Sequence, residues 1–177
     1  FSDGTVWNIE EIGRQASIHR GTEANDVMHS YDDVLGYTKN ETFYGGAGDD
    51  TIEAGGGNDK LYVGTGNDTL RGGTGDDIYY FELGDGEDII LDDDSSLRNA
   101  DRIVFGKGIS PVDVYAERVE NDLIIKYSAT DKITIKNAYA YKSYVGYGAY
   151  FIENIEFSDG TIWNIEEIGR QASIHRG

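Results

Sequence analysis

The residues best placed to do chemistry in this chain are four aspartates that recur every nine positions. They are Asp50, Asp59, Asp68 and Asp77, and each follows one glycine by two residues and another by four. A large apolar residue stands two positions after each aspartate, namely Ile52, Leu61, Leu70 and Tyr79. Carboxylates and backbone carbonyl groups are the oxygen ligands that hard divalent cations prefer. The pattern therefore indicates repeated cation sites.

A nine-residue period also predicts the elements that position these aspartates. The last three residues of each repeat can form a short strand with one inward side chain, and the other six must turn the chain. Glycine at the second and fourth positions permits the positive φ that such a turn needs. Two repeats then complete one coil of a flattened parallel helix. Asp50 should lie over Asp68, and Asp59 over Asp77.

The stacked turns favour calcium over other metals. Stacked carboxylates repel each other, and a cation with six to eight oxygen ligands removes that repulsion. Calcium accepts irregular cages of carbonyl and carboxylate oxygens, whereas magnesium requires a tight octahedron and keeps its waters. Zinc prefers Cys and His, but the chain has no Cys and residues 21–94 contain one His. We therefore expect several Ca²⁺ ions.

Negative charge is concentrated in the same segment. Residues 21–94 hold 19 acidic and 3 basic side chains and 15 of the 24 glycines, and the whole chain has a formal charge of −18. Self-repulsion and glycine entropy oppose folding of this segment without cations. The charge also disfavours nucleic acid and anionic membrane surfaces as partners. No apolar run reaches the roughly 18 residues of a membrane span, and residues 1–10 lack the basic and apolar regions of a signal peptide.

The nonapeptides resemble the RTX (repeats-in-toxin) calcium-binding motif GGxGxDxUx of secreted bacterial proteins, closely over 45–80 and more loosely over 21–44. The resemblance implies a parallel β-roll with calcium between its turns. It names as metal ligands the position-six aspartates and the carbonyls of the turn glycines: Gly46, Gly48, Asp50, Gly55, Gly57, Asp59, Gly64, Gly66, Asp68, Gly73, Gly75 and Asp77. In the repeat 36–44, Glu41 replaces the aspartate and Lys39 stands where glycine belongs.

The remainder of the chain has the alternating pattern of β-strands. Strands are expected at 102–105, 113–117, 122–127 and 132–136, and a hairpin at 153–163 with its turn at 158–160. Asn164 and Glu167 form a capping box before a helix at 165–172, and Asn8 and Glu11 repeat it for 9–16. This part resembles the haemolysin-type calcium-binding-related domain that follows RTX repeats. Its expected role is to cap the open end of the roll.

A long repeat encloses the short ones. Residues 1–21 and 157–177 are identical at 20 of 21 positions. This indicates that the chain is a little over one repeat unit of a longer tandem array. The predicted organisation is the end of a preceding unit (1–20), an RTX roll (21–94) and a β-rich cap (95–177). The fold class expected is all-β, a parallel β-roll capped by an antiparallel β-rich domain with short helices.

The leading hypothesis is a non-enzymatic calcium-binding module of a large secreted protein, an adhesin or a toxin. The RTX resemblance implies export by type I secretion machinery and folding on extracellular calcium. No nucleophile elbow, H-E-x-x-H motif or P-loop occurs, and His19, His29 and His175 lack partners at catalytic spacing.

The alternative is a module attached to a secreted enzyme that binds polysaccharide or a host cell surface. Five tyrosines, at 139, 141, 144, 147 and 150, could form an aromatic platform for sugars, or could pack as an ordinary loop. Asp92, Asp93 and Asp94 could hold a further calcium ion or form a solvated turn.

Overall fold

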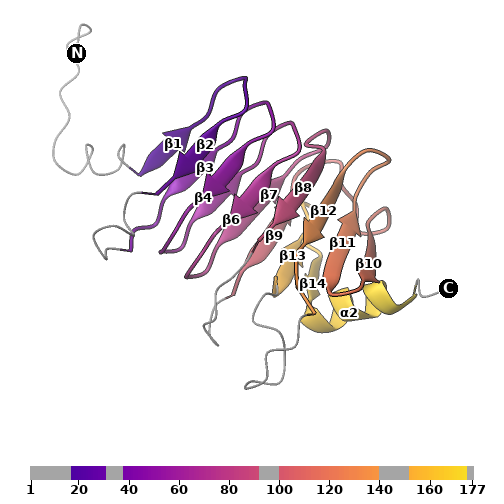
Figure 1. Cartoon of the computed structure of the whole chain (residues 1–177). Helices are drawn as coiled ribbons and strands as arrows, with labels where there is room; N and C mark the ends of the chain where they lie inside the picture. The colour runs from indigo at the N-terminus through magenta and orange to yellow at the C-terminus, as the bar shows by residue number, and fades with distance from the viewer. Residues whose placement is uncertain (1–16, 31–37, 92–99, 140–151, 175–177) are drawn as a thin grey trace, which may run out of the picture.

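The structure, a computed structural model, describes residues 17–30, 38–91, 100–139 and 152–174. Within these ranges the chain forms two seven-stranded sheets, which face each other across a flattened roll (Figure 1). The first sheet has the order β1 (Ile18–Arg20), β3 (Thr42–Tyr44), β5 (Lys60–Tyr62), β7 (Ile78–Phe81), β9 (Arg102–Phe105), β13 (Asn154–Glu156) and β14 (Ile162–Asn164). The second has the order β10 (Tyr115–Val119), β11 (Asp122–Lys126), β12 (Lys132–Ile135), β8 (Glu87–Ile90), β6 (Thr69–Arg71), β4 (Thr51–Glu53) and β2 (Val27–His29).

Successive strands of the repeat region alternate between the two sheets. Each pairs in parallel with the strand two places further on, so that β4 pairs with β6 and β5 with β7. The register places Thr51 beside Thr69 and Lys60 beside Ile78. The predicted β-roll is therefore confirmed, and the aspartates that precede these strands stack in the predicted pairs.

The core of the roll is a stack of inward side chains: each of the strands β3 to β6 buries one, and β7 buries three. Phe43, Leu61 and Tyr79 line one sheet, and Ile52 and Leu70 line the other; all are fully buried. A buried side chain of this size contributes roughly 1.5–3 kcal/mol. This free energy is small compared with the entropic cost of ordering the backbone of the nine residues in each repeat. Hydrophobic burial alone is thus a weak source of stability for the roll.

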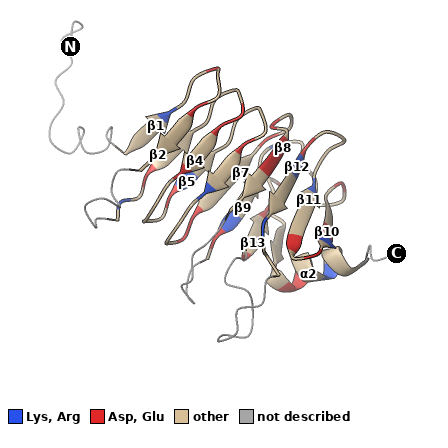
Figure 2. Ribbon diagram, in the orientation of Figure 1, with Lys and Arg blue, Asp and Glu red and all other residues tan. Residues whose placement is uncertain are grey.

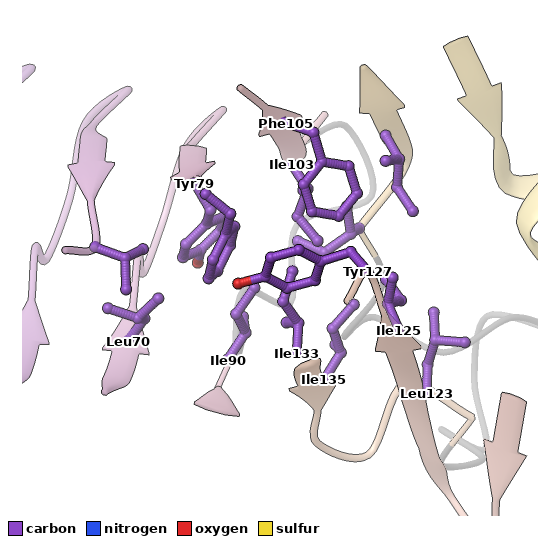
Figure 3. Packing of buried hydrophobic residues seen from close by; sticks show 14 of the residues in the cluster. Leu70, Tyr79, Ile90, Ile103, Phe105, Leu123, Ile125, Tyr127, Ile133 and Ile135 are labelled. Atoms are coloured by element: carbon purple, nitrogen blue, oxygen red, sulfur yellow. The ribbon is translucent and has the colours of Figure 1, made fainter. Parts of the chain in front are cut away.

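The cap continues both sheets of the roll. β12 pairs in parallel with β8 of the roll, β9 pairs in parallel with β7 of the roll, and β13 pairs in parallel with β9. Only then do the sheets become antiparallel, through β11 and β10 on one side and β14 on the other. The aromatic rings of Phe81, Phe105 and Tyr127 pack where roll and cap meet. Figure 3 shows Phe105 and Tyr127 at this junction. The hydrophobic core is therefore continuous across the junction.

Most predicted elements of the cap occur where expected. β10 begins two residues later than the predicted strand 113–117 and runs to Val119, beside a two-residue turn in which Glu120 has a φ of 56°. The helix α2 spans Ile165–Ile174, and Asn164 Oδ1 accepts a hydrogen bond from the Glu167 N–H at 3.0 Å, as the capping box requires. Ile168 and Ala172 are its buried residues, and the helix lies against β10.

Some predicted features lie outside the described residues. These are the helix at 9–16, the aspartates at 92–94, four of the five clustered tyrosines and His175. No helix in the described part of the chain is long and apolar enough to cross a membrane.

Candidate metal sites in the turns of the roll

The turn glycines bring one coil directly onto the next. All eight glycines predicted as carbonyl ligands have positive φ, between 91° and 148°. A Cβ atom built on Gly66 would lie 2.0 Å from the carbonyl oxygen of Gly48, and one built on Gly75 would lie 2.0 Å from that of Gly57. Real Cβ atoms do not approach so closely, so only glycine permits this stacking. The close approach brings backbone carbonyls of consecutive coils into the turns.

The position-six aspartates form a hydrogen-bonded ladder inside the turns. Asp50 N–H donates to Asp68 Oδ1 at 2.7 Å, and Asp59 N–H donates to Asp77 Oδ1 at 2.8 Å. At the start of the roll, Glu41 N–H donates to Asp59 Oδ1 at 2.7 Å. One oxygen of each carboxylate therefore holds the coil before it in place.

The ladder extends beyond the predicted ligands. Asp68 N–H donates to Asp88 Oδ1 at 2.9 Å, and Asp77 N–H donates to Asp101 Oδ1 at 2.7 Å. Sequence reasoning missed Asp88 and Asp101 because the spacing grows from 18 residues to 20 and then 24. Asp88 keeps the full motif out of phase, with Gly84 and Gly86 before it and Ile90 after it, whereas Asp101 keeps only the apolar residue two positions on, Ile103.

The other carboxylate oxygen of several ladder residues is buried without a hydrogen-bond partner. This holds for Asp50, Asp68 and Asp88 through Oδ2, and for Glu41 through Oε2. None of these four residues is more than 4% exposed. A buried charged oxygen without a partner is costly. A cation would compensate that cost, and carboxylate with carbonyl oxygens is the donor set of calcium. The residues present therefore fit a calcium ion.

Burial also changes how readily these carboxylates ionise. Desolvation raises the pKa of Asp68 and of Asp88 to about 7, although each accepts a backbone hydrogen bond that acts in the opposite direction. Repulsion from neighbouring aspartates adds to the effect of burial. The charged form is thus disfavoured in the turns unless positive charge enters them.

We expect the calcium-free chain to fold better in acid than at alkaline pH. A carboxyl whose pKa is about 7 when folded and about 4 when unfolded binds more protons in the folded state between those values. Its stabilising contribution is therefore complete below about pH 4 and is lost as the pH rises through about 7. In a calcium chelator, the strand signal in far-UV circular dichroism should be larger at pH 5 than at pH 8.

The double variant Asp68→Asn/Asp88→Asn is the control, because it removes these two titrating carboxyls and hardly changes the shape of either side chain. Its calcium-free signal should depend less on pH than that of the unchanged chain. Equal strand signals at pH 5 and pH 8 in the unchanged chain would contradict the raised pKa values.

A second ladder lies on the exposed side of the turns and was not predicted. Asp49 Oδ1 accepts from Asn67 N–H at 2.9 Å, and Asn58 Oδ1 accepts from Asp76 N–H at 3.1 Å. Asn and Asp alternate here because either side chain supplies the acceptor. This position holds the turns together without requiring charge, whereas the inner position uses carboxylates only. Figure 2 shows acidic residues at the turns on both sides of the roll.

The described histidines and carboxylates do not form a conventional side-chain metal centre. In residues 17–30, 38–91, 100–139 and 152–174, no three His, Cys, Asp or Glu side chains converge as one would require. A metal ion in the turns would therefore depend on backbone carbonyls. His19 Nε2 lies 3.0 Å from Glu41 Oε1, and His29 Nδ1 lies 2.9 Å from Glu53 Oε2. These contacts link strands of neighbouring coils.

Comparison with known proteins agrees with this geometry. Residues 35–70 and 59–89 match the family model of the RTX calcium-binding nonapeptide repeat, and residues 122–167 match that of the haemolysin-type calcium binding protein related domain. No curated protein matches the chain. Among solved structures, the AlgE6R2 subunit from the Azotobacter vinelandii mannuronan C5-epimerase is 23% identical, with a TM-score of 0.50. The match covers 70% of this chain and 86% of that one, and at this identity it shows a shared fold.

Proposed function

We propose that this chain is a non-catalytic module that folds when calcium enters its turns. It carries RTX calcium-binding nonapeptide repeats at 35–89 and a haemolysin-type calcium binding protein related domain at 122–167. The observation that carries the proposal is the set of buried carboxylate oxygens without hydrogen-bond partners in Asp50, Asp68 and Asp88. Each lies at a turn whose glycine backbones stack coil on coil.

Calcium binding would act as the folding switch. Without cations, the acidic segment 21–94 repels itself and buries one large side chain per nonapeptide. Extracellular calcium modules bind with affinities of about 10⁻⁴ to 10⁻³ M. Binding to the folded state alone then stabilises that state by mass action. The chain would remain unfolded where calcium is scarce and fold where calcium is millimolar.

The proposed setting is a large secreted bacterial protein, an adhesin or a toxin, exported by type I secretion. An unfolded acidic segment suits passage through a narrow channel, and the nearly identical segments 1–21 and 157–177 suit a tandem array. A polysaccharide or host cell surface as partner stays a prediction. Of the clustered tyrosines, Tyr139 lies in the described part, and the Arg118 guanidinium covers its ring at 4.4 Å from the centroid.

A calcium titration followed by far-UV circular dichroism tests the proposal. We expect little strand signal in chelator and a cooperative gain as calcium rises through about 10⁻⁴ to 10⁻³ M. Magnesium at the same concentrations is the control, and it should produce a much smaller change because it prefers a tight octahedral site. Equal strand content with chelator and with calcium at pH 7.5 would refute the switch.

A further inference from the structure

Buried oxygen-bearing side chains from the roll and the cap gather where the two meet. Asp85 lies in the turn between β7 and β8, Asp88 lies in β8, and Tyr127 directly follows β11 of the cap. Their exposed fractions are 4%, 1% and 2%. Asp68, from the preceding coil, is 1% exposed. Three of these groups belong to the roll and one to the cap.

Three of these side chains have an oxygen atom that forms no hydrogen bond: Asp68 and Asp88 through Oδ2, and Tyr127 through its hydroxyl. Asp88 uses Oδ1 to accept from Asp68 N–H, and its Oδ2 is buried without a partner. The Tyr127 hydroxyl is also buried without a partner. The Tyr127 observation is independent of the acidic cluster. Repulsion between like charges can keep two carboxylates apart, but it does not act on a neutral phenol and so does not explain why its hydroxyl lacks a hydrogen bond. A buried hydroxyl normally finds a partner.

The Tyr127 hydroxyl is directed from the cap into the roll. In Figure 3 its oxygen points away from Ile125 toward the side where Tyr79 and Ile90 lie. Burial raises the pKa of Tyr127, and the charges of Asp88 and Asp85 add to the shift. The hydroxyl and these two carboxylates therefore share one buried, strongly negative environment.

Asp131 of the cap has a different role in the same place. Its Oδ2 accepts from Gly84 N–H at 2.9 Å, and its Oδ1 accepts from Thr130 Oγ1 at 3.0 Å. Burial alone would raise its pKa, but these and further hydrogen bonds hold the pKa below its usual range. Asp131 thus attaches the cap to the turn before β8 through hydrogen bonds that are already complete.

We propose that Asp85, Asp88 and the Tyr127 hydroxyl hold one calcium ion shared between the roll and the cap. Tyr127 supplies a neutral oxygen, and Asp85 and Asp88 supply charged ones. The ion then strengthens docking of the cap, because the last site of the roll is incomplete without a cap residue. This inference rests on the proposed calcium function.

The number of bound ions tests the shared site. Equilibrium dialysis of the full chain with calcium should show one ion fewer in Tyr127→Phe and in Asp85→Asn than in the unchanged chain. Both substitutions are close to isosteric, and circular dichroism in millimolar calcium should still show the roll. Tyr115→Phe is the matched control, since it removes from the same cap a hydroxyl that donates to Glu117 Oε2 at 3.4 Å, and it should keep the full number of ions.

Amide hydrogen exchange provides a second readout in the same variants. Protection should fall at least tenfold in β11 and β12 of Tyr127→Phe and stay unchanged in β4 and β6. Asp131→Asn should weaken protection of the same cap strands while the ion count stays full. A full ion count in either Tyr127→Phe or Asp85→Asn would overturn the shared site. No calcium binding by the unchanged chain would instead overturn the proposed function itself.

Discussion

Asp68→Asn is expected to raise the calcium concentration at the folding midpoint at least tenfold. The substitution keeps an oxygen that can accept from Asp50 N–H, a bond of 2.7 Å. It removes the charge of the second oxygen, which is buried and has no hydrogen-bond partner. Losing even an indirect partner of a metal ligand typically costs 10–100-fold in affinity, so the loss of a charged ligand should cost no less. The midpoint is measured by circular dichroism during calcium titration.

Asp49→Asn is the matched control for this experiment. It removes the same charge from the neighbouring position of the same repeat pattern, where Asn58 and Asn67 already occur. Asp49 Oδ1 accepts from Asn67 N–H on the exposed side of the turn, and an amide oxygen can replace it there. Its midpoint should shift less than twofold. If Asp68→Asn and Asp49→Asn shifted the midpoint equally, the buried oxygen of Asp68 would not be a calcium ligand.

Gly66→Ala should prevent the roll from forming even in millimolar calcium. Gly66 has a φ of 148°, and an added Cβ would lie 2.0 Å from the Gly48 carbonyl oxygen. The clash involves backbone, so no side chain can move to relieve it. The two coils must separate, which would also open the turn in which calcium is proposed to bind. Far-UV circular dichroism and thermal unfolding in calcium are the measurements.

Gly160→Ala is the control that measures the conformational strain of a positive φ without a steric clash. Gly160 also has positive φ, 89°, but no heavy atom lies within 4 Å of the added Cβ. Its cost should be about 1 kcal/mol, the usual cost of forcing a non-glycine residue into the left-handed region. The chain should fold with a small decrease in Tm. A Gly66→Ala variant as stable as Gly160→Ala would show that the stacked turns tolerate a side chain.

The regular part of the roll was predictable because nine-residue periodicity is local information. Glycine at positions two and four, aspartate at six and an apolar residue at eight each have a local physical reason. All of these local preferences favour the same course of the backbone, so the stacking of Asp50 over Asp68 could be predicted by counting residues. The helix at 165–174 was predictable on the same grounds, since Asn164 and Glu167 form a local cap.

The continuation of the aspartate ladder into the cap was not predictable by counting. Asp101 accepts from Asp77 N–H across 24 residues, and Glu153 accepts from Asp101 N–H across 52. The intervening loops change the spacing, and only the pairing of β9 with β7 and β13 restores the alignment. Sheet pairing is a long-range choice that a local pattern does not contain.

The sequence by itself therefore determined the repeating turn and its acidic lining, and it predicted the need for a cation, because these depend on neighbouring residues and total charge. Tertiary structure decided which oxygens remain without partners. Asp88 and Tyr127 lie 39 positions apart; Asp88 is out of phase with the regular nonapeptides, and Tyr127 lies outside them. They share one buried environment because β12 pairs with β8 and carries the cap onto the last coil of the roll.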